Sequence, residues 1–169
     1  MTYLNLNEKK LVPVVGELNK LLADYSIYYQ NLRGFHWNIL GKNFFDLHEK
    51  FEELYNDAKI KIDEIAERIL TLRYHPVSKY SDYLKISSIS EDTGLIDDRE
   101  MVKTLLTNHG NLLNRMRETL KLAEDAGDEG TIDMMGSYIA SLEKSSWMLD
   151  AWIKKTTDQL KQSGMVKTS

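Results

Sequence analysis

The chain has 169 residues, which suits one domain with a substantial buried core, and it contains no cysteine, which excludes disulfides and thiolate metal sites. Its formal net charge of -4 disfavours a dedicated nucleic-acid binder, because such domains usually carry a basic patch. No apolar stretch is long enough for a membrane span, and the N-terminus lacks a signal-peptide pattern. We therefore expect one cytoplasmic domain over residues 1–169, with short flexible ends at about 1–6 and 162–169.

The first half of the chain predicts two long helices. Apolar residues recur at three-and-four spacing over residues 8–36, with Asn7 placed to cap the start. A second helix is predicted over 43–74, with Asn43 as its cap and an end before His75-Pro76. Its apolar stripe is the cleanest in the chain and consists of Leu47, Phe51, Leu54, Ala58, Ile62, Ile65, Ile69 and Leu72.

The second half predicts two more helices after a long connection. Residues 76–97 are too many for a tight turn, and 78–86 have the composition of a short helix. A third helix is predicted over 98–125, where Asp97 and Glu100 resemble a capping box, and a fourth over 131–161. A long crossover implies that the third helix returns from the far end. The predicted fold is all-α, a four-helix bundle with a long crossover between its second and third helices.

Two histidines and two carboxylates in the first half form a candidate metal-ligand set. His36 and His48 flank one short turn among aromatic residues, while Asp63 and Glu67 lie four residues apart on one helical face. Imidazoles together with carboxylates suit iron. The alternative for the carboxylates is a solvated pair or pairing with Arg68 or Arg73, and the solvated alternative also applies to Glu52. His109 differs, because it lies on an apolar stripe and is expected to be buried and hydrogen-bonded.

The separation of these residues limits how they can bind one ion. His48 and Asp63 are 15 residues apart on one predicted helix, which corresponds to about 22 Å. The chain also lacks the Glu-x-x-His motifs of a di-iron site inside one bundle. Either the histidines and carboxylates are unrelated, or a second copy completes the site. A two-fold axis near the middle of the second helix would create two such sites at once.

Several motifs together resemble the Dps family, the ferritin-like mini-ferritins named for DNA-binding proteins from starved cells. They are H-W-N at 36–38, G-K-N-F-F-D-L-H-E-K-F-E-E-L-Y at 41–55, D-E-I-A-E-R at 63–68, G-D-E-G-T at 127–131 and W-M-L at 147–149. The resemblance implies that His36 and His48 are ferroxidase ligands from one subunit and that Asp63 and Glu67 come from its two-fold mate. Glu52 stands where members often have Asp, which implies a second-metal or water-linked ligand. Trp37 corresponds to an aromatic residue thought to protect against escaping radicals.

The same resemblance implies a function and an assembly. Family members form a hollow dodecamer, oxidise Fe(II) preferentially with hydrogen peroxide and store the ferric mineral, so this chain is expected to be a ferroxidase that protects against oxidative stress. An acidic run lies near the start of the fourth helix, where carboxylates offset the helix dipole. In a threefold assembly these residues would instead attract Fe(II) to a pore, with Asp128 and Asp133 as the candidates.

Two other functions are alternatives for this chain. One is a nucleoid-compacting DNA-binding structural protein with a minor iron role, and the other is an iron-dependent oxygenase or rubrerythrin-type enzyme. The first seven residues contain no Lys or Arg, although residues 154–169 carry a net charge of +3. That composition disfavours a DNA-coating role, and the missing Glu-x-x-His motifs disfavour the oxygenase.

Overall fold

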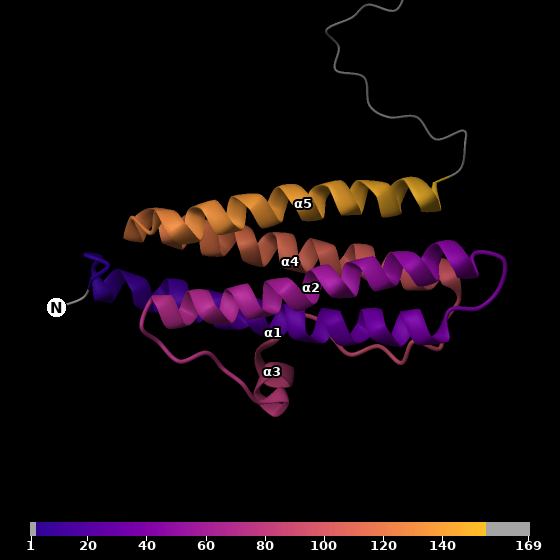
Figure 1. The fold of residues 1–169 in the computed structure, drawn as a ribbon, viewed down its shortest axis with the longest axis horizontal. Coiled ribbons are helices and arrows are strands. Elements are labelled where there is room, and N and C mark those ends of the chain that lie inside the picture. Colours follow the sequence, from indigo (N-terminus) through magenta and orange to yellow (C-terminus); the bar gives the residue numbers. More distant parts are fainter. Residues whose placement is uncertain (1–2, 155–169) are drawn as a thin grey trace, which may run out of the picture.

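The computed structural model describes residues 3–154, and this part of the chain is helical and contains no strand. Four long helices lie side by side, and a short one lies outside this group, next to the first long helix (Figure 1). No helix in the described part is both long and apolar enough to cross a membrane. The five helices are α1 (Glu8–Asn38), α2 (Phe44–Thr71), α3 (Tyr80–Ile86), α4 (Asp98–Ala126) and α5 (Glu129–Ile153).

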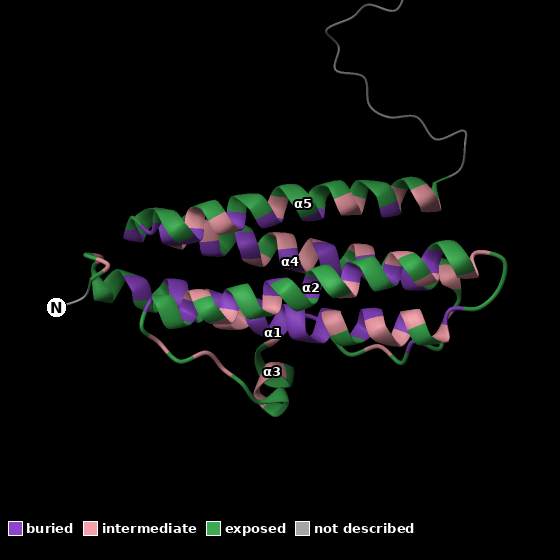
Figure 2. Ribbon diagram, in the orientation of Figure 1, coloured by how far each residue is buried: buried purple, intermediate pink, exposed green. Residues whose placement is uncertain are grey.

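The connection between α2 and α4 runs back along the molecule. The chain leaves α2 at one end, passes through α3, and enters α4 near the opposite end (Figure 1). The helix α3 packs against α1, which also packs against α2 and α4. Residues 21–28 of α1 are consequently buried without a break, and buried positions elsewhere face the middle of the molecule (Figure 2).

The helix bounds differ from the predicted ones at identifiable residues. Helix α2 ends at Thr71, earlier than predicted, because Arg73 adopts a left-handed backbone with φ of 72°. Helix α4 ends at Ala126, one residue later than predicted, and its C-cap is Gly127, whose φ of 66° favours glycine. Helix α5 begins at Glu129, two residues before the prediction. It ends at Ile153, earlier than the predicted residue 161, since Lys154 has an extended backbone with ψ of 151°. Residues 155–169, which include the predicted end at 162–169, and residues 1–2 lie outside the described part of the chain.

The predicted N-cap residues of the helices differ in whether their side chains make capping hydrogen bonds. Asn7 accepts a hydrogen bond from the Lys9 amide at 3.0 Å, and Asp97 accepts from the amides of Arg99 and Glu100, so these caps are confirmed. Asn43 is the N-cap residue of α2, as predicted, but its side chain makes no capping hydrogen bond. Its amide instead donates to Asp98 Oδ2 at 2.6 Å, which ties the turn after α1 to the start of α4.

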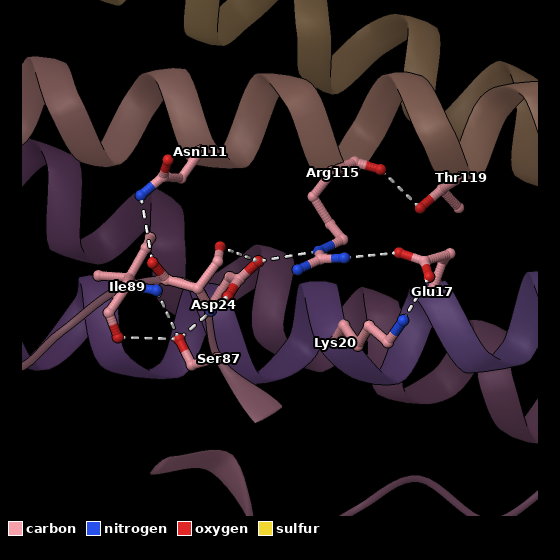
Figure 3. A network of polar contacts seen from close by, with 9 residues as sticks. Glu17, Lys20, Asp24, Ser87, Ile89, Asn111, Arg115 and Thr119 are labelled. Atoms are coloured by element: carbon pink, nitrogen blue, oxygen red, sulfur yellow. Dashed lines mark hydrogen bonds and ion pairs between the residues drawn. The ribbon is translucent and has the colours of Figure 1, made fainter. Parts of the chain in front are cut away.

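A buried carboxylate holds the long connection against the helices (Figure 3). Asp24 of α1 is fully buried and accepts hydrogen bonds from Ser87 Oγ at 2.9 Å and the Ser88 amide at 2.6 Å. Arg115 of α4 donates its Nε to Asp24 at 3.2 Å and its Nη1 to Glu17 at 2.8 Å. One carboxylate therefore joins α1, the connection and α4.

His109 is buried in the core, as its place on the apolar stripe predicted. It is 1% exposed, and its two ring nitrogens lie 2.7 Å from the Tyr28 hydroxyl and 2.8 Å from the Ser146 hydroxyl. Burial lowers the pKa of His109 from 6.5 to about 4, with a smaller contribution from the charge of Lys50. The folded protein therefore keeps this ring neutral at pH values where the unfolded chain protonates it.

This difference predicts a pH-dependent stability. As the pH falls from 6.5 toward 4, the unfolded state takes up a proton at His109 that the folded state does not, so folding becomes less favourable. We expect wild type to lose up to about 3 kcal/mol more than His109→Gln over this range. Urea unfolding at pH 7 and pH 4 measures this, with the exposed His75→Gln as the matched control. Equal pH dependence in wild type and His109→Gln would contradict the assignment.

Candidate metal centre

The two histidines of the first half meet at the junction of α1 and α2. His36 lies in the last turn of α1, and His48 lies near the start of α2. The turn between them includes Gly41, whose φ of 96° favours glycine. It reverses the chain so that the two imidazole rings stack, with centroids 3.8 Å apart and planes 22° apart. Both side chains are half-buried.

Reciprocal hydrogen bonds fix both rings in one tautomer. His36 Nδ1 lies 2.8 Å from the His48 carbonyl oxygen, and His48 Nδ1 lies 2.9 Å from the His36 carbonyl oxygen. Because a carbonyl oxygen only accepts hydrogen bonds, each Nδ1 carries the proton and donates. Each neutral ring then has its lone pair on Nε2, which is the arrangement found in metal-ligating histidines. The pair therefore offers two nitrogen donors at one place.

Aromatic side chains hold this pair on both sides. Phe44 stacks on His48 with ring centroids 4.8 Å apart, and the edge of Tyr55 meets His36 at 5.3 Å. Phe44 is one of the aromatic neighbours of His48 expected from the sequence, whereas Tyr55 was not predicted there, although its spacing of seven positions from His48 places it on the same side of α2. They restrict rotation of the imidazoles and so preserve the direction of the donor atoms.

Trp37, one position beyond His36, is more than half exposed. The Arg33 guanidinium lies over its ring, 4.7 Å from the centroid, and also 5.4 Å from the centroid of Tyr29. Tyr29 in turn contacts Tyr55 at 6.1 Å. Tyr55, Tyr29 and Arg33 thus form a chain of contacts that leads from His36 to Trp37.

Asp63 and Glu67 do not lie with the histidines in the single chain. Both are exposed on α2, and residues 3–154 contain no convergence of three or more His, Asp or Glu side chains suited to a metal. Neither carboxylate makes an ion pair within the described part, and Arg68 pairs with Asp128 instead of Glu67. The two carboxylates therefore remain available to a ligand from outside the chain.

Glu52 lies between the two groups, one turn after His48. Desolvation and, to a smaller extent, the charge of Glu52 raise the pKa of Tyr55, the residue whose ring contacts His36. One outward-facing stripe of α2 joins all the candidate carboxylates, and its exposed members are Glu52, Asn56, Ile60, Asp63 and Glu67.

The two candidate pore residues have different surroundings. Asp128 is 1% exposed, caps α5 through the Thr131 amide and pairs with Arg68. A side chain at Gly130 would come within 2.8 Å of the Arg68 guanidinium, so glycine permits this pairing. Asp133 is exposed and lines a depression of about 450 Å³ that Glu67 also lines. Asp133 thus has a free carboxylate, whereas that of Asp128 is used within the chain.

Known proteins are similar to this chain both in sequence and in the arrangement of their helices. A family model for the ferritin-like domain matches residues 15–158. A DNA protection during starvation protein from Porphyromonas gingivalis is 43% identical over 150 residues, covering 89% of this chain and 94% of the relative.

Solved structures agree with this. A Dps protein from Vibrio cholerae, described as a member of a superfamily of ferritin-like diiron-carboxylate proteins, superposes with a TM-score of 0.88 at 47% identity, covering 91% of this chain and 98% of the other. A Dps protein from Bacillus brevis gives a TM-score of 0.84 at 38% identity, covering 86% and 98%.

Proposed function

Because this chain belongs to the Dps family of ferritin-like proteins, we propose that it is a ferroxidase that oxidises Fe(II) with hydrogen peroxide and stores the ferric product. The observation that carries the proposal is the histidine pair, whose two Nε2 atoms are free while both Nδ1 atoms are held by carbonyl oxygens. Two nitrogen donors alone do not complete the coordination of an iron ion. Oxygen ligands must therefore come from elsewhere, and carboxylates are suitable for both Fe(II) and Fe(III).

A second subunit supplies the missing ligands in this proposal. If a two-fold axis crosses α2 between Tyr55 and Asn56, His48 of one subunit faces Asp63 of its partner, since these positions are equally far from the axis. The exposed stripe of α2 supports this arrangement, because it includes Ile60, which is 59% exposed in the single chain and would be covered in a dimer. A two-fold interface repeats every contact, so each dimer has two sites.

Each group at such a site has a definite role. His36 and His48 donate Nε2 lone pairs to Fe(II), while Asp63 and Glu67 of the partner subunit contribute negative charge that favours Fe(III) over Fe(II). Glu52, one turn after His48 on the same stripe of α2, is the candidate ligand for a second iron or its water. Trp37 and Tyr55 are positioned to reduce radicals that leave the site.

The storage function requires a closed shell. We propose that four-helix bundles with the α2–α4 crossover assemble into a hollow dodecamer in the cytoplasm. Asp133 is the better pore candidate, because its carboxylate is exposed whereas that of Asp128 is paired with Arg68. Negative potential along such a pore would raise the local concentration of Fe(II).

The test combines assembly size with iron oxidation. Light scattering should give a dodecamer, and stopped-flow absorbance should show faster Fe(II) oxidation with peroxide than with oxygen. His48→Ala should slow oxidation at low iron by about 10- to 100-fold, since it removes a ligand. His75→Ala, at an exposed histidine outside the site, is the control.

The contrary outcomes are distinct. A monomeric wild type, or unchanged oxidation in His48→Ala, would refute the shared ferroxidase site. An assembled protein that does not oxidise Fe(II) but binds duplex DNA in a salt-dependent manner would favour the nucleoid-compacting alternative. Lys154, the first residue of the basic C-terminal stretch, pairs with Asp150 at 3.0 Å, and residues 155–169 lie outside the described part.

A further inference from the structure

A hydrogen-bonded tyrosine–histidine pair lies in the core, away from the proposed iron ligands. Tyr28 of α1 and His109 of α4 are 2% and 1% exposed, and the Tyr28 hydroxyl lies 2.7 Å from His109 Nε2. Their rings meet edge to face with centroids 5.4 Å apart. The ferroxidase reaction proposed above does not use either residue.

The hydrogen bonds determine which atom of this pair holds the proton. The Ser146 hydroxyl donates to the Leu142 carbonyl oxygen at 2.6 Å, so its oxygen must accept from His109 Nδ1 at 2.8 Å. Nδ1 of the neutral ring therefore carries the hydrogen, and Nε2 has the free lone pair. Tyr28 consequently donates its hydroxyl hydrogen to Nε2.

This arrangement suits the loss of one electron from Tyr28. A phenol that loses an electron becomes a strong acid and must transfer its proton at once, and His109 Nε2 is in place to accept it. Burial raises the pKa of Tyr28 well above 10, so the resting group is the phenol and needs such an acceptor. Within residues 3–154 the hydroxyl of the neighbouring Tyr25 has no such acceptor, since its hydrogen-bond partner there is the thioether of Met116 at 3.9 Å.

A row of tyrosines connects this pair with the surface that carries Glu67. Tyr28 contacts Tyr25 with centroids 6.2 Å apart, and Tyr25 contacts Tyr138 at 6.4 Å, both edge to face. Tyr138 of α5 lines the depression that Glu67 also lines. Electrons can thus pass between the core and that depression through aromatic rings in contact.

We propose that Tyr28 and His109 form an internal one-electron donor site that reduces hydroxyl radical arising where iron meets peroxide. Tyr28 gives one electron through Tyr25 and Tyr138 to the hydroxyl radical, which becomes hydroxide. The O–H bond of Tyr28 breaks, its proton forms a bond to His109 Nε2, and a neutral phenoxyl radical beside an imidazolium results. A later Fe(II) returns the electron and becomes Fe(III), and the proton returns to Tyr28.

The source of the radical rests on the proposed ferroxidase function, so the test has two arms. In the first arm the iron-free, full-length protein is oxidised by photochemically generated sulfate radical and frozen for high-field EPR. In the second arm Fe(II) and then peroxide replace the photochemical oxidant. The variants are Tyr28→Phe and His109→Gln, with Tyr80→Phe at a 71% exposed tyrosine as the control.

The expected result is a long-lived tyrosyl signal in both arms with coupling to one exchangeable deuteron in D2O. Tyr28→Phe should lose this signal, and His109→Gln should lose the deuteron coupling and shorten the lifetime, whereas Tyr80→Phe should keep both. The proposal is overturned if folded, assembled shells of Tyr28→Phe keep the signal, or if those of His109→Gln keep both the deuteron coupling and the lifetime. Size measurement and circular dichroism show whether the shells are folded and assembled.

The two arms also separate the two proposals. A signal in the first arm that is absent from the second, while Fe(II) is still oxidised, would overturn the connection to iron chemistry. If wild type does not oxidise Fe(II), the proposed function fails, and the first arm alone still decides whether the pair donates an electron.

Discussion

Asp63→Ala is expected to slow peroxide-dependent Fe(II) oxidation by about 10- to 100-fold at low iron while the protein stays folded and assembled. The carboxylate is exposed and makes no ion pair within the described residues, so its loss removes nothing that stabilises the single chain. Its effect must therefore come from a ligand role that only a second copy can bring beside the histidines. Stopped-flow absorbance at sub-stoichiometric iron measures the rate.

A matched control lies on the same helix. Glu53 is also an exposed carboxylate of α2, but it pairs with Lys50 at 2.9 Å and lies one residue after Glu52, so it points about 100° away from the outward-facing stripe. Glu53→Ala should leave oxidation close to wild type, and Asp63→Asn should behave like Asp63→Ala, because it keeps the shape but removes the charge. Equal rates in Asp63→Ala and Glu53→Ala would exclude Asp63 as a ligand.

Arg115→Ala is expected to cause the largest loss of stability. Asp24 is fully buried, and Arg115 is the cation that pairs with it. Truncation of Arg115 therefore leaves a buried negative charge without a positively charged partner. Breaking a buried pair in this way costs about 3–5 kcal/mol in the free energy of unfolding. Because Asp24 also holds Ser87 and Ser88, the variant should first loosen the connection between α2 and α4, as increased hydrogen exchange there would show.

The neighbouring arginine of α4 offers the control. Arg117 pairs with Glu143 at 2.7 Å, but both side chains are 51% exposed. Arg117→Ala should therefore change stability by no more than about 1 kcal/mol. Denaturant unfolding of the two variants side by side tests the difference. Similar losses in both would show that burial of Asp24 does not control this effect.

The fold was largely readable from the spacing of apolar residues. The predicted stripe of α2 is buried except for Ile62, which is partly buried, because a helix with one apolar face has only one way to pack it. The helix ends were less predictable. The end of α2 depends on the left-handed backbone of Arg73. The Asn43 side chain donates a hydrogen bond to Asp98 of α4 instead of capping α2. Contacts of this kind depend on residues far away in the sequence.

The sequence indicates which side chains form the candidate site, but not how these side chains are arranged in space. The types and spacing of His36, His48, Asp63 and Glu67 predict iron ligands shared between two subunits, which stays a prediction, and the structure brings the two histidines together within one chain. The reciprocal bonds to carbonyl oxygens could not be predicted, since they require the exact closure of the turn. Likewise, a buried role for Asp128 follows from Arg68, which reaches it across the fold.

Mixed assemblies test the shared site most directly. One variant lacks both histidines through His36→Ala and His48→Ala, and the other lacks both carboxylates through Asp63→Ala and Glu67→Ala. Each should be inactive alone. When the two are coassembled in equal amounts, half of the dimers are mixed and each mixed dimer has one complete site, so oxidation should recover to about one quarter of wild type. Recovery at this level supports a site built from two subunits, and mixed shells as inactive as their parents would contradict it.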